Sequence, residues 1–589
     1  MRVVRDVTGD APSALAGAGV AVPETTAWQG PRDDARSGAR PYLAHGLFAA
    51  LLVLGVLPVW LVAQVPTQDG GNHVESVVGL LRLPQSALLQ RSYLPNYGLQ
   101  PNWLTQALLA GLVQVVSPRV AEKLILSGYL VLLPLAYRAL LPRTARGAWA
   151  ALLIFPFVAS YPFHMGFWNF SYSLVLFFVV LGYWHRTRGR MGARRGLGFT
   201  ALTTLLFVAH SVSLASALAA MTAALVWRAA LDLWRARHRP ERGRRIRAGS
   251  LRRAIATYLY ASPAIALLGL FLVHQPRPLS YRPPLLDYAK HLAGLYALVS
   301  FDRRELLVTC AVAAVIAVSV LAALGDRTRR RLRVVDAWLA AGVLATALYF
   351  AMPDSAADGA QLNDRLALYP YFAALLWLGF AAVPARRVRA AALAVAALSV
   401  AGAALRLAEY RAIAPYVADY QSVAPHVAEG STILPLTFAP FGPRRGGAID
   451  GKKLLSYRVQ PFTHQGGYVA TDRRGIDLDN SQANTHHTPL RWRDELNPFT
   501  YLSTRPFGME AEPPCVELWA YEALGGRVDY VVLWGATAAA ARDECGGAVL
   551  RELRAGYDRV YVSPMGMAEL YRRADRPLPA PPASTSRAE

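Results

Sequence analysis

The chain has 589 residues, of which 54% are hydrophobic and only 17% are charged. A soluble protein of this length needs more polar side chains to cover its surface, so the composition excludes that class and indicates a membrane protein. The formal net charge is +23, but the Arg residues occur in short clusters between apolar segments, as in cytoplasmic loops of membrane proteins. We therefore expect a membrane lipid environment and no nucleic acid partner.

The first 40 residues are rich in Ala, Gly, Asp and Arg and lack a sustained apolar period, which predicts a disordered cytoplasmic tail at 1–40. The first apolar segment is long and no small-residue cleavage site follows it, so we expect it to remain as a membrane anchor. A helix needs about 20 apolar residues to cross a bilayer, although some are shorter. On this basis about eleven transmembrane helices are predicted, at 45–64, 120–141, 147–163, 167–185, 196–209, 212–230, 254–273, 304–325, 336–352, 366–384 and 390–408.

The apolar segment 102–117 is ambiguous. If it crossed, the Arg clusters near 186–195 and 327–331 would lie outside the cell, which inverts the positive-inside rule. If it lies in the membrane surface or re-enters, every Arg cluster is cytoplasmic. The charge rule therefore predicts a multi-pass membrane protein with a cytoplasmic N-terminus and an extracytoplasmic C-terminus.

Hydropathy drops after residue 408, which divides the expected transmembrane domain, 41–408 with an external loop at 65–119, from a small extracytoplasmic soluble α/β domain at 409–573. Within the latter, the pattern predicts helices and strands at 415–428, 433–436, 528–534, 538–555, 559–563 and 568–571. The stretch 442–506 is too rich in Gly, Pro, Asn and Arg to assign. Cys515 and Cys545 would be permitted to form a disulfide in an oxidising compartment, and the tail 574–589 is predicted to be disordered.

The external loop opens with Asp69, Gly70, Gly71, Asn72 and His73 directly after the first crossing. A carboxylate at this depth is placed to take a proton from an acceptor hydroxyl while a lipid-linked donor lies alongside. The alternative for Asp69 is a helix N-cap, and the two roles are compatible. His73 would share a helix face with Asp69, although a histidine there is more often packed or at the surface.

Aromatic and polar residues mark the other outward turns. Trp103 favours the membrane interface, with a wall of a substrate groove as the functional alternative. His164, Trp168 and Asn169 come from the turn between two crossings, where aromatic rings would stack on a sugar or an isoprenoid. His210 interrupts an apolar stretch, which suggests a functional residue and equally a packed, hydrogen-bonded one.

Arg365 precedes the tenth predicted crossing on the outward face. A guanidinium there would bind a phosphate by paired hydrogen bonds, and a salt bridge to Asp364 or Asp354 is the equal alternative. The candidate residues are therefore Asp69 and His73 for catalysis, and Asn72, Trp103, His164, Trp168, Asn169, His210 and Arg365 for binding substrate or phosphate.

This layout resembles the GT-C superfamily of integral-membrane glycosyltransferases. The likeness rests on an acidic residue at the start of the first external loop (Asp69), surface helices before the second crossing, a second external turn at 164–169 and an external C-terminal domain. The resemblance implies a polyprenyl-phosphate-linked sugar donor and gives Asp69 the role of catalytic base or metal contact, with a divalent metal ion as the cofactor in the second case.

The chain also resembles a group of bacterial membrane proteins with an Asp-Gly-x-x-His element, here at 69–73, and a Gly-Phe-x-Asn-Phe element, here at 166–170. Many GT-C enzymes carry a second acidic residue in the second external loop, where this chain has His164 and Asn169. The leading hypothesis is an inverting glycosyltransferase that acts on an extracytoplasmic glycan, lipid or protein acceptor. The alternative is a non-catalytic membrane protein that binds or translocates a lipid-linked glycan, but a transporter should show internal repeats, and none is evident in the sequence.

Overall fold

The computed structural model of the protein describes most of the chain. The described residues are 41–238, 240–275, 281–326, 332–355, 360–442, 455–485, 487–505, 508–537 and 540–575. The tail predicted at 1–40 lies outside the described residues, as does the predicted C-terminal tail beyond residue 575.

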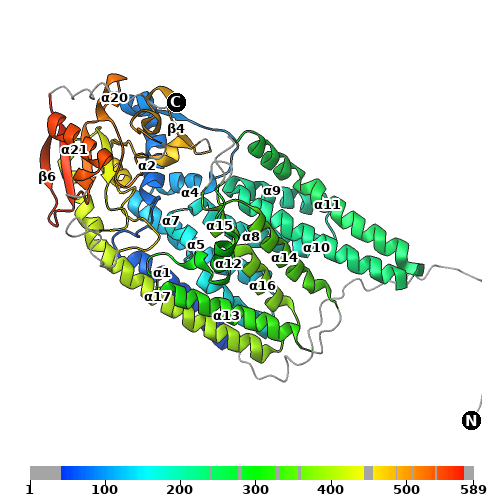
Figure 1. Ribbon diagram of the computed structural model, residues 1–589. Coiled ribbons are helices and arrows are strands. Elements are labelled where there is room, and N and C mark those ends of the chain that lie inside the picture. Colours follow the sequence, from blue (N-terminus) through cyan, green and yellow to red (C-terminus); the bar gives the residue numbers. More distant parts are fainter. Residues whose placement is uncertain are drawn as a thin grey trace, which may run out of the picture.

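The described part of the chain is mostly helical (Figure 1). The longer helices of the bundle are α1 (Pro41–Leu61), α5 (Pro118–Leu140), α8 (Trp168–Thr187), α9 (Ala193–Ala209), α10 (Ser211–His238), α11 (Pro240–Val273), α13 (Glu305–Leu324), α14 (Ala337–Ala351), α16 (Leu368–Phe380) and α17 (Ala385–Gln421). Shorter helical segments connect them: α6 (Ala145–Ala150), η3 (Ala151–Phe157), α7 (Tyr161–Met165), α12 (Leu285–Ala293), η4 (Tyr296–Leu298), η6 (Val334–Asp336) and α15 (Leu362–Leu366).

Among the described residues, seven helices are long and apolar enough to cross a membrane, namely α1, α5, α10, α11, α13, α14 and α17. Their outer faces expose large apolar side chains, for example Val53, Leu307 and Val343, at 66%, 75% and 71%. Such surfaces are stable in contact with lipid chains and costly in water. The other predicted crossings correspond to α6 with η3, α8, α9 and α16, which are shorter or less apolar. The fold is thus compatible with a mostly helical membrane protein.

The ambiguous segment 102–117 forms only one short helix, α4 (Leu104–Leu112). Nine residues extend over about 14 Å, roughly half the thickness of the hydrocarbon core, so α4 is too short to cross it. The same loop contains α2 (Gly70–Arg82), η2 (Leu83–Gln85), α3 (Ala87–Ser92) and β1 (Tyr93–Pro95).

The region after α17 contains a five-stranded sheet with the order β3-β2-β5-β7-β6. The strands are β2 (Thr432–Thr437), β3 (Ile476–Asp477), β5 (Tyr530–Trp534), β6 (Tyr557–Val562) and β7 (Ala568–Arg573). β2 pairs in parallel with β3 and β5, whereas β7 pairs antiparallel with β5 and β6. The helical segments here are η7 (Ala424–His426), α18 (Gly466–Asp472), η8 (Ser481–Asn484), η9 (Asp494–Leu496), α19 (Pro498–Tyr501), α20 (Leu518–Ala523), η10 (Ala540–Arg542) and α21 (Glu544–Gly556).

The strands predicted after residue 408 therefore match β2, β5, β6 and β7, and the last predicted helix overlaps α21. The start of this region differs from the prediction. The helix predicted at 415–428 is not separate, because α17 continues through residue 408 and through Pro415 without interruption. The helix thus joins the bundle directly to the sheet (Figure 1).

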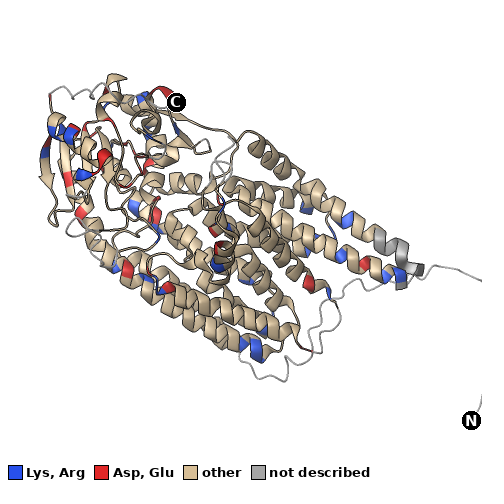
Figure 2. Ribbon diagram, in the orientation of Figure 1, with Lys and Arg blue, Asp and Glu red and all other residues tan. Residues whose placement is uncertain are grey.

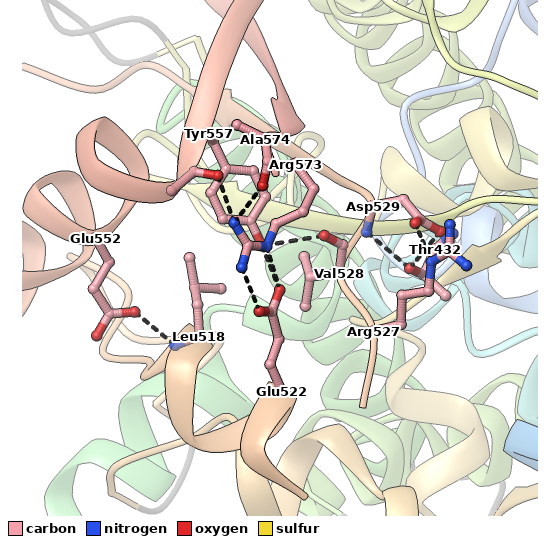
Figure 3. Close-up of polar contacts among 11 residues, drawn as sticks. Thr432, Leu518, Glu522, Arg527, Val528, Asp529, Glu552, Tyr557, Arg573 and Ala574 are labelled. Carbon is pink, nitrogen blue, oxygen red and sulfur yellow. Dashed lines mark hydrogen bonds and ion pairs between the residues drawn. The ribbon is translucent and has the colours of Figure 1, made fainter. Parts of the chain in front are cut away.

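Three networks of polar contacts fix the elements around the sheet (Figure 3). The Arg573 guanidinium on β7 donates two hydrogen bonds to the Glu522 carboxylate on α20, at 2.8 and 2.9 Å. Asp529 accepts hydrogen bonds from the backbone N–H and the hydroxyl of Thr432, at 2.9 and 3.1 Å. Glu552 on α21 accepts one from the Leu518 backbone N–H at 2.8 Å, so α20 is attached both to β7 and to α21.

The segment 65–119 and the sheet region lie at the same end of the bundle (Figure 1). β1 pairs antiparallel with β4 (Leu490–Trp492), with Tyr93 opposite Trp492 and their rings 4.2 Å apart. Charged residues are also frequent at this end, whereas few are coloured along the middle of the long helices (Figure 2). Lys and Arg reappear at the far ends of α10, α11 and α17 (Figure 2). The two regions that the predicted mechanism needs in one compartment are therefore in direct contact.

Candidate functional site

The two short motifs singled out in the sequence touch each other. The backbone N–H of Asp69 donates to the carbonyl of Met165 at 3.1 Å, and that of Gln68 donates to His164 at 3.0 Å. Gly166 follows with φ +92°, a backbone conformation that L side chains rarely adopt, and a Cβ atom there would lie 2.8 Å from the Cβ of Asp69. A glycine at position 166 is thus required for the second motif to pack against Asp69 of the first motif.

The start of α2 also packs, backbone against backbone, on α18. A Cβ atom at Gly71 would overlap the carbonyl oxygen of His464, and one at Gly467 would lie 2.6 Å from the carbonyl carbon of Gly71. These glycines at the start of both helices let the main chains meet without side chains between them. The contact brings His464, which lies just before α18, next to Asp69.

Asp69 occupies the N-cap position of α2, but its side chain makes no capping hydrogen bond. The alternative in which capping is its sole role therefore has no support in the geometry. The carboxylate is 7% exposed and lies 3.6 Å from Nε2 of His464. Burial raises the pKa of Asp69 to about 6, against the opposing effect of the positive charges of His464 and Arg365. Asp69 is thus ionised at neutral pH and protonated in mild acid.

His464 lies between two carboxylates. Its Nδ1 is 3.5 Å from Oδ2 of Asp479, on the side opposite Asp69. Burial lowers the pKa of His464, but Asp479, Asp69 and Glu510 together raise it to about 10. The imidazole is therefore protonated at neutral pH, and it stabilises the ionised form of Asp69.

Further buried carboxyl groups lie behind this pair. Glu75 accepts hydrogen bonds from the backbone N–H of Asp477 at 2.9 Å and from the Tyr93 hydroxyl at 3.3 Å. Burial raises the pKa of Asp477 to about 8, with Asp479 adding to the effect. One oxygen each of Glu75, Asp477 and Asp479 has no hydrogen-bond partner. Within the described ranges, no three His, Cys, Asp or Glu side chains are arranged to hold a metal ion, so the geometry gives the metal-contact role of Asp69 no support.

Arg365 forms neither of the salt bridges considered from the sequence. Asp364 pairs with Arg458 at 2.8 Å instead, and Asp354 accepts a hydrogen bond from the backbone N–H of Asn363 at 3.1 Å. The Arg365 guanidinium lies 4.1 Å from the centre of the Phe167 ring. Its Nη1 is 3.3 Å from Nε2 of His210, and its Nε has no partner.

The positive charge of Arg365 is close enough to Asp69 for each to affect the other electrostatically. Arg365 lies against Phe167 and His210, and Phe167 directly follows Gly166, which packs on Asp69. The guanidinium keeps the capacity to bind an anion.

His73 is held on both sides. Its Nε2 lies 2.7 Å from the Gly166 carbonyl and its Nδ1 lies 2.7 Å from Nε2 of Gln106, so Nε2 donates and Nδ1 accepts. The ring also packs on Trp168, with centroids 4.7 Å apart. Burial lowers the pKa of His73 to about 4, which leaves the ring neutral. These contacts support the packing alternative for His73.

The remaining candidates mainly hold elements together. Asn169 accepts from the Thr105 backbone N–H and donates to the Asn102 carbonyl, both at 2.8 Å, which fixes the start of α4. His164 is buried between the hydroxyls of Ser300 and Tyr410, at 2.9 and 2.7 Å.

Asn72 and Trp103 also form hydrogen bonds with neighbouring segments, Asn72 through its side-chain amide and Trp103 through its backbone N–H. Asn72 donates to the Asp479 carbonyl at 3.2 Å and to the Ser481 hydroxyl at 3.1 Å, which ties α2 to the segment that carries Asp479. Trp103 is half-buried, its backbone N–H donates to the Val208 carbonyl at 3.0 Å, and its indole N–H has no partner.

Sequence reasoning missed His464 and Asp479, because both fall in the stretch 442–506 that was left unassigned. A signal was present: the pair Gly466 and Gly467 comes two residues after His464, and the pair Gly70 and Gly71 comes directly after Asp69. Paired glycines at two helix starts indicate close backbone contact, but nothing in the sequence shows that these two helices are partners.

No protein-family model matches the chain, and no curated protein sequence is similar to it. The fold and the site by themselves define a mostly helical protein with helices that can cross a membrane and a buried polar site at one end, where α2 meets α18.

Proposed function

We propose that the protein is an inverting membrane glycosyltransferase of the GT-C type, with a polyprenyl-phosphate-linked sugar as donor. The observation that carries this function is the position of Asp69: a buried carboxylate without a capping bond, between a protonated histidine and a guanidinium that has no carboxylate partner. Such a transfer requires a base, a group that keeps the base ionised, and a cation that stabilises the phosphate leaving group.

In the proposed reaction Asp69 accepts the proton of an acceptor hydroxyl. The acceptor oxygen forms a bond to the anomeric carbon as the bond from that carbon to the donor phosphate oxygen breaks, and the electron pair leaves with the phosphate. Arg365 stabilises the charge of the departing lipid phosphate. A pKa of about 6 for Asp69 suits this role, since a general base works best when its pKa lies near the working pH. His464 acts as a positioning residue that holds Asp69 ionised.

We place the site on the extracytoplasmic side of a bacterial inner membrane, with eleven crossings and a cytoplasmic N-terminus. Cys515 and Cys545 are joined in a disulfide, which supports an oxidising compartment for the region after α17. The Arg-bearing ends of α10, α11 and α17 then face the cytoplasm (Figure 2). The extracytoplasmic α/β region would select the acceptor, a lipid, a glycan or a protein, because it lies against the start of α2.

The test is transfer of a labelled sugar from a polyprenyl-phosphate donor by the purified full-length protein. Asp69→Asn keeps the size of the side chain and removes the base, so we expect a loss of about 10²- to 10⁴-fold in rate. Asp494→Asn is the matched control, because Asp494 is exposed, with 90% of its side chain accessible. Equal transfer by wild type and Asp69→Asn would remove Asp69 from the mechanism. Donor binding without transfer by the wild type would favour the non-catalytic alternative.

A further inference from the structure

A second arginine without a partner lies in the membrane-facing part of the molecule, away from the residues assigned above. Arg406 belongs to α17, one of the helices able to cross a membrane. Among the described residues it has no hydrogen-bond or ion-pair partner, and its Nε is buried. A charged side chain in a membrane helix is costly unless it is paired or reaches the interface.

The direction of the Arg406 side chain shows that its guanidinium does not reach the membrane interface. The Arg406 nitrogens lie beside Gly402, 3.6 and 3.7 Å from the position of a Cβ atom there. Gly402 is one turn nearer the N-terminal end of α17, so the guanidinium points along the helix away from the sheet end of the molecule. It therefore does not extend toward the nearer aqueous end of the bundle.

Neither neighbouring acid forms an ion pair or a hydrogen bond with Arg406. Glu409, on the next turn of α17, pairs with Arg304 at 3.3 Å. Glu305 is close enough to interact electrostatically with Arg406; one of its carboxylate oxygens accepts a hydrogen bond from the Ser300 backbone N–H, and the other has no hydrogen-bond partner. The N–H donors of Arg406 are thus left for an acceptor from outside the described residues.

The surroundings of Arg406 specify the kind of anion. Arg406 lines a cavity with apolar walls from α1, η3 and α17, to which Leu54, Gly55, Phe155 and Ala403 contribute. No atom lies within 4 Å of a Cβ placed at Gly55, so the glycine leaves open space on α1. The neighbouring α1 residues Val53 and Leu57 are 66% and 44% exposed on the outer surface of the bundle, where acyl chains would lie.

We infer that the cavity between α1 and α17 is a binding site for the phosphate of a membrane lipid, with Arg406 as the group that holds the phosphate and the apolar walls in contact with the acyl chains. The guanidinium provides paired donors that match phosphate oxygens. On the predicted topology the lipid lies in the outer leaflet. This site does not depend on the proposed transfer reaction, because none of its residues belongs to the Asp69 site.

The test uses full-length protein purified in a nonionic detergent and native mass spectrometry. The two probes are dioleoylphosphatidylglycerol and dioleoylglycerol, which share acyl chains and differ in the phosphate-containing headgroup. We expect the wild type to retain the phospholipid in preference, and Arg406→Gln to weaken its binding by about tenfold or more, since a hydrogen bond to a charged group contributes 1.5–3 kcal/mol.

Two further variants separate the site from general effects of charge. Gly55→Leu keeps the arginine and fills the cavity, so it should weaken binding as well. Arg411→Gln removes an exposed arginine from the same helix and should leave binding unchanged. Undiminished binding of the phospholipid by Arg406→Gln overturns the inference. Displacement of the phospholipid by an equal concentration of inorganic phosphate overturns it too, because the site would then recognise a free ion.

Discussion

Two arginine clusters of this molecule differ in how completely their polar atoms are bonded. At the sheet, Arg573 donates to both oxygens of Glu522 and, through Nη1, to the carbonyls of Gly556 and Ala574 at 2.8 Å each (Figure 3). At the Asp69 site, Arg365 has one hydrogen-bonding neighbour among the described residues, His210, and lies over the rings of Phe167 and Phe170. A cluster whose donors and acceptors are all paired stabilises the fold, whereas one with unpaired donors is completed by a ligand.

If the two clusters differ in this way, Arg365→Gln should reduce sugar transfer about a hundredfold or more, because it removes the cation that stabilises the leaving phosphate. The thermal unfolding temperature should change little, since Arg365 makes few contacts within the protein. Steady-state rates and a thermal melt of the same preparation measure both effects. Arg365→Lys keeps the charge but not the paired donors, so it should fall between wild type and Arg365→Gln. A large drop in unfolding temperature without loss of activity per folded molecule would show that Arg365 stabilises the fold and does not take part in transfer.

At the sheet, Glu522→Gln should do the opposite. It leaves the Arg573 guanidinium without its charged partner, which should lower the free energy of local unfolding by about 2 kcal/mol, as expected for a hydrogen bond to a charged group. Amide hydrogen exchange of β7 in the full-length protein measures this local opening. Transfer activity of the folded protein should stay near the wild-type value. Unchanged exchange at β7 would show that the ion pair adds nothing to the sheet.

His464→Gln sharpens the contrast on the acidic side of the Asp69 site. The protonated imidazole lowers the pKa of Asp69, so its removal should raise that pKa further above the wild-type value of about 6. Because the ionised carboxylate is the base, the acidic limb of the profile of kcat/KM against pH should move to higher pH. His426→Gln, which changes an exposed histidine, should leave the profile where it was. If the acidic limb lay at the same pH in both variants, His464 would have no effect on the pKa of Asp69.

Asp477→Asn should have the smallest effect when stability is measured in acid. The folded-state pKa of Asp477, about 8, lies above its ordinary value of 3.8, so the folded protein binds the proton more tightly than the unfolded chain does. Its contribution to stability is therefore present below pH 4 and is lost as the pH rises through 8. The variant cannot ionise. Thermal melts should find it within about 1 kcal/mol of wild type at pH 4 and more stable than wild type at pH 8. A variant that is less stable at pH 8 than at pH 4, relative to wild type, would contradict the raised pKa.

The sequence predicted apolar helices long enough to cross a membrane, a segment 102–117 that does not form a full crossing, and the strands β2, β5, β6 and β7. These features depend on local quantities, namely hydropathy, charge between apolar segments and alternation along short strands. It also identified Asp69, His210 and Arg365 as candidates. A polar residue at the end of an apolar segment can be recognised without knowing which residues lie near it in space.

Only the tertiary structure decided which of these residues meet. His464 and Asp479 lie about 400 positions from Asp69 and reach it through the contact of Gly71 with Gly467. His73, His164 and Asn169 looked equally suited to chemistry, but their polar atoms are bonded to neighbouring backbone and side chains. A residue type states what a side chain is able to do. Whether the side chain is free to do it depends on partners that are distant in the sequence and adjacent only after packing.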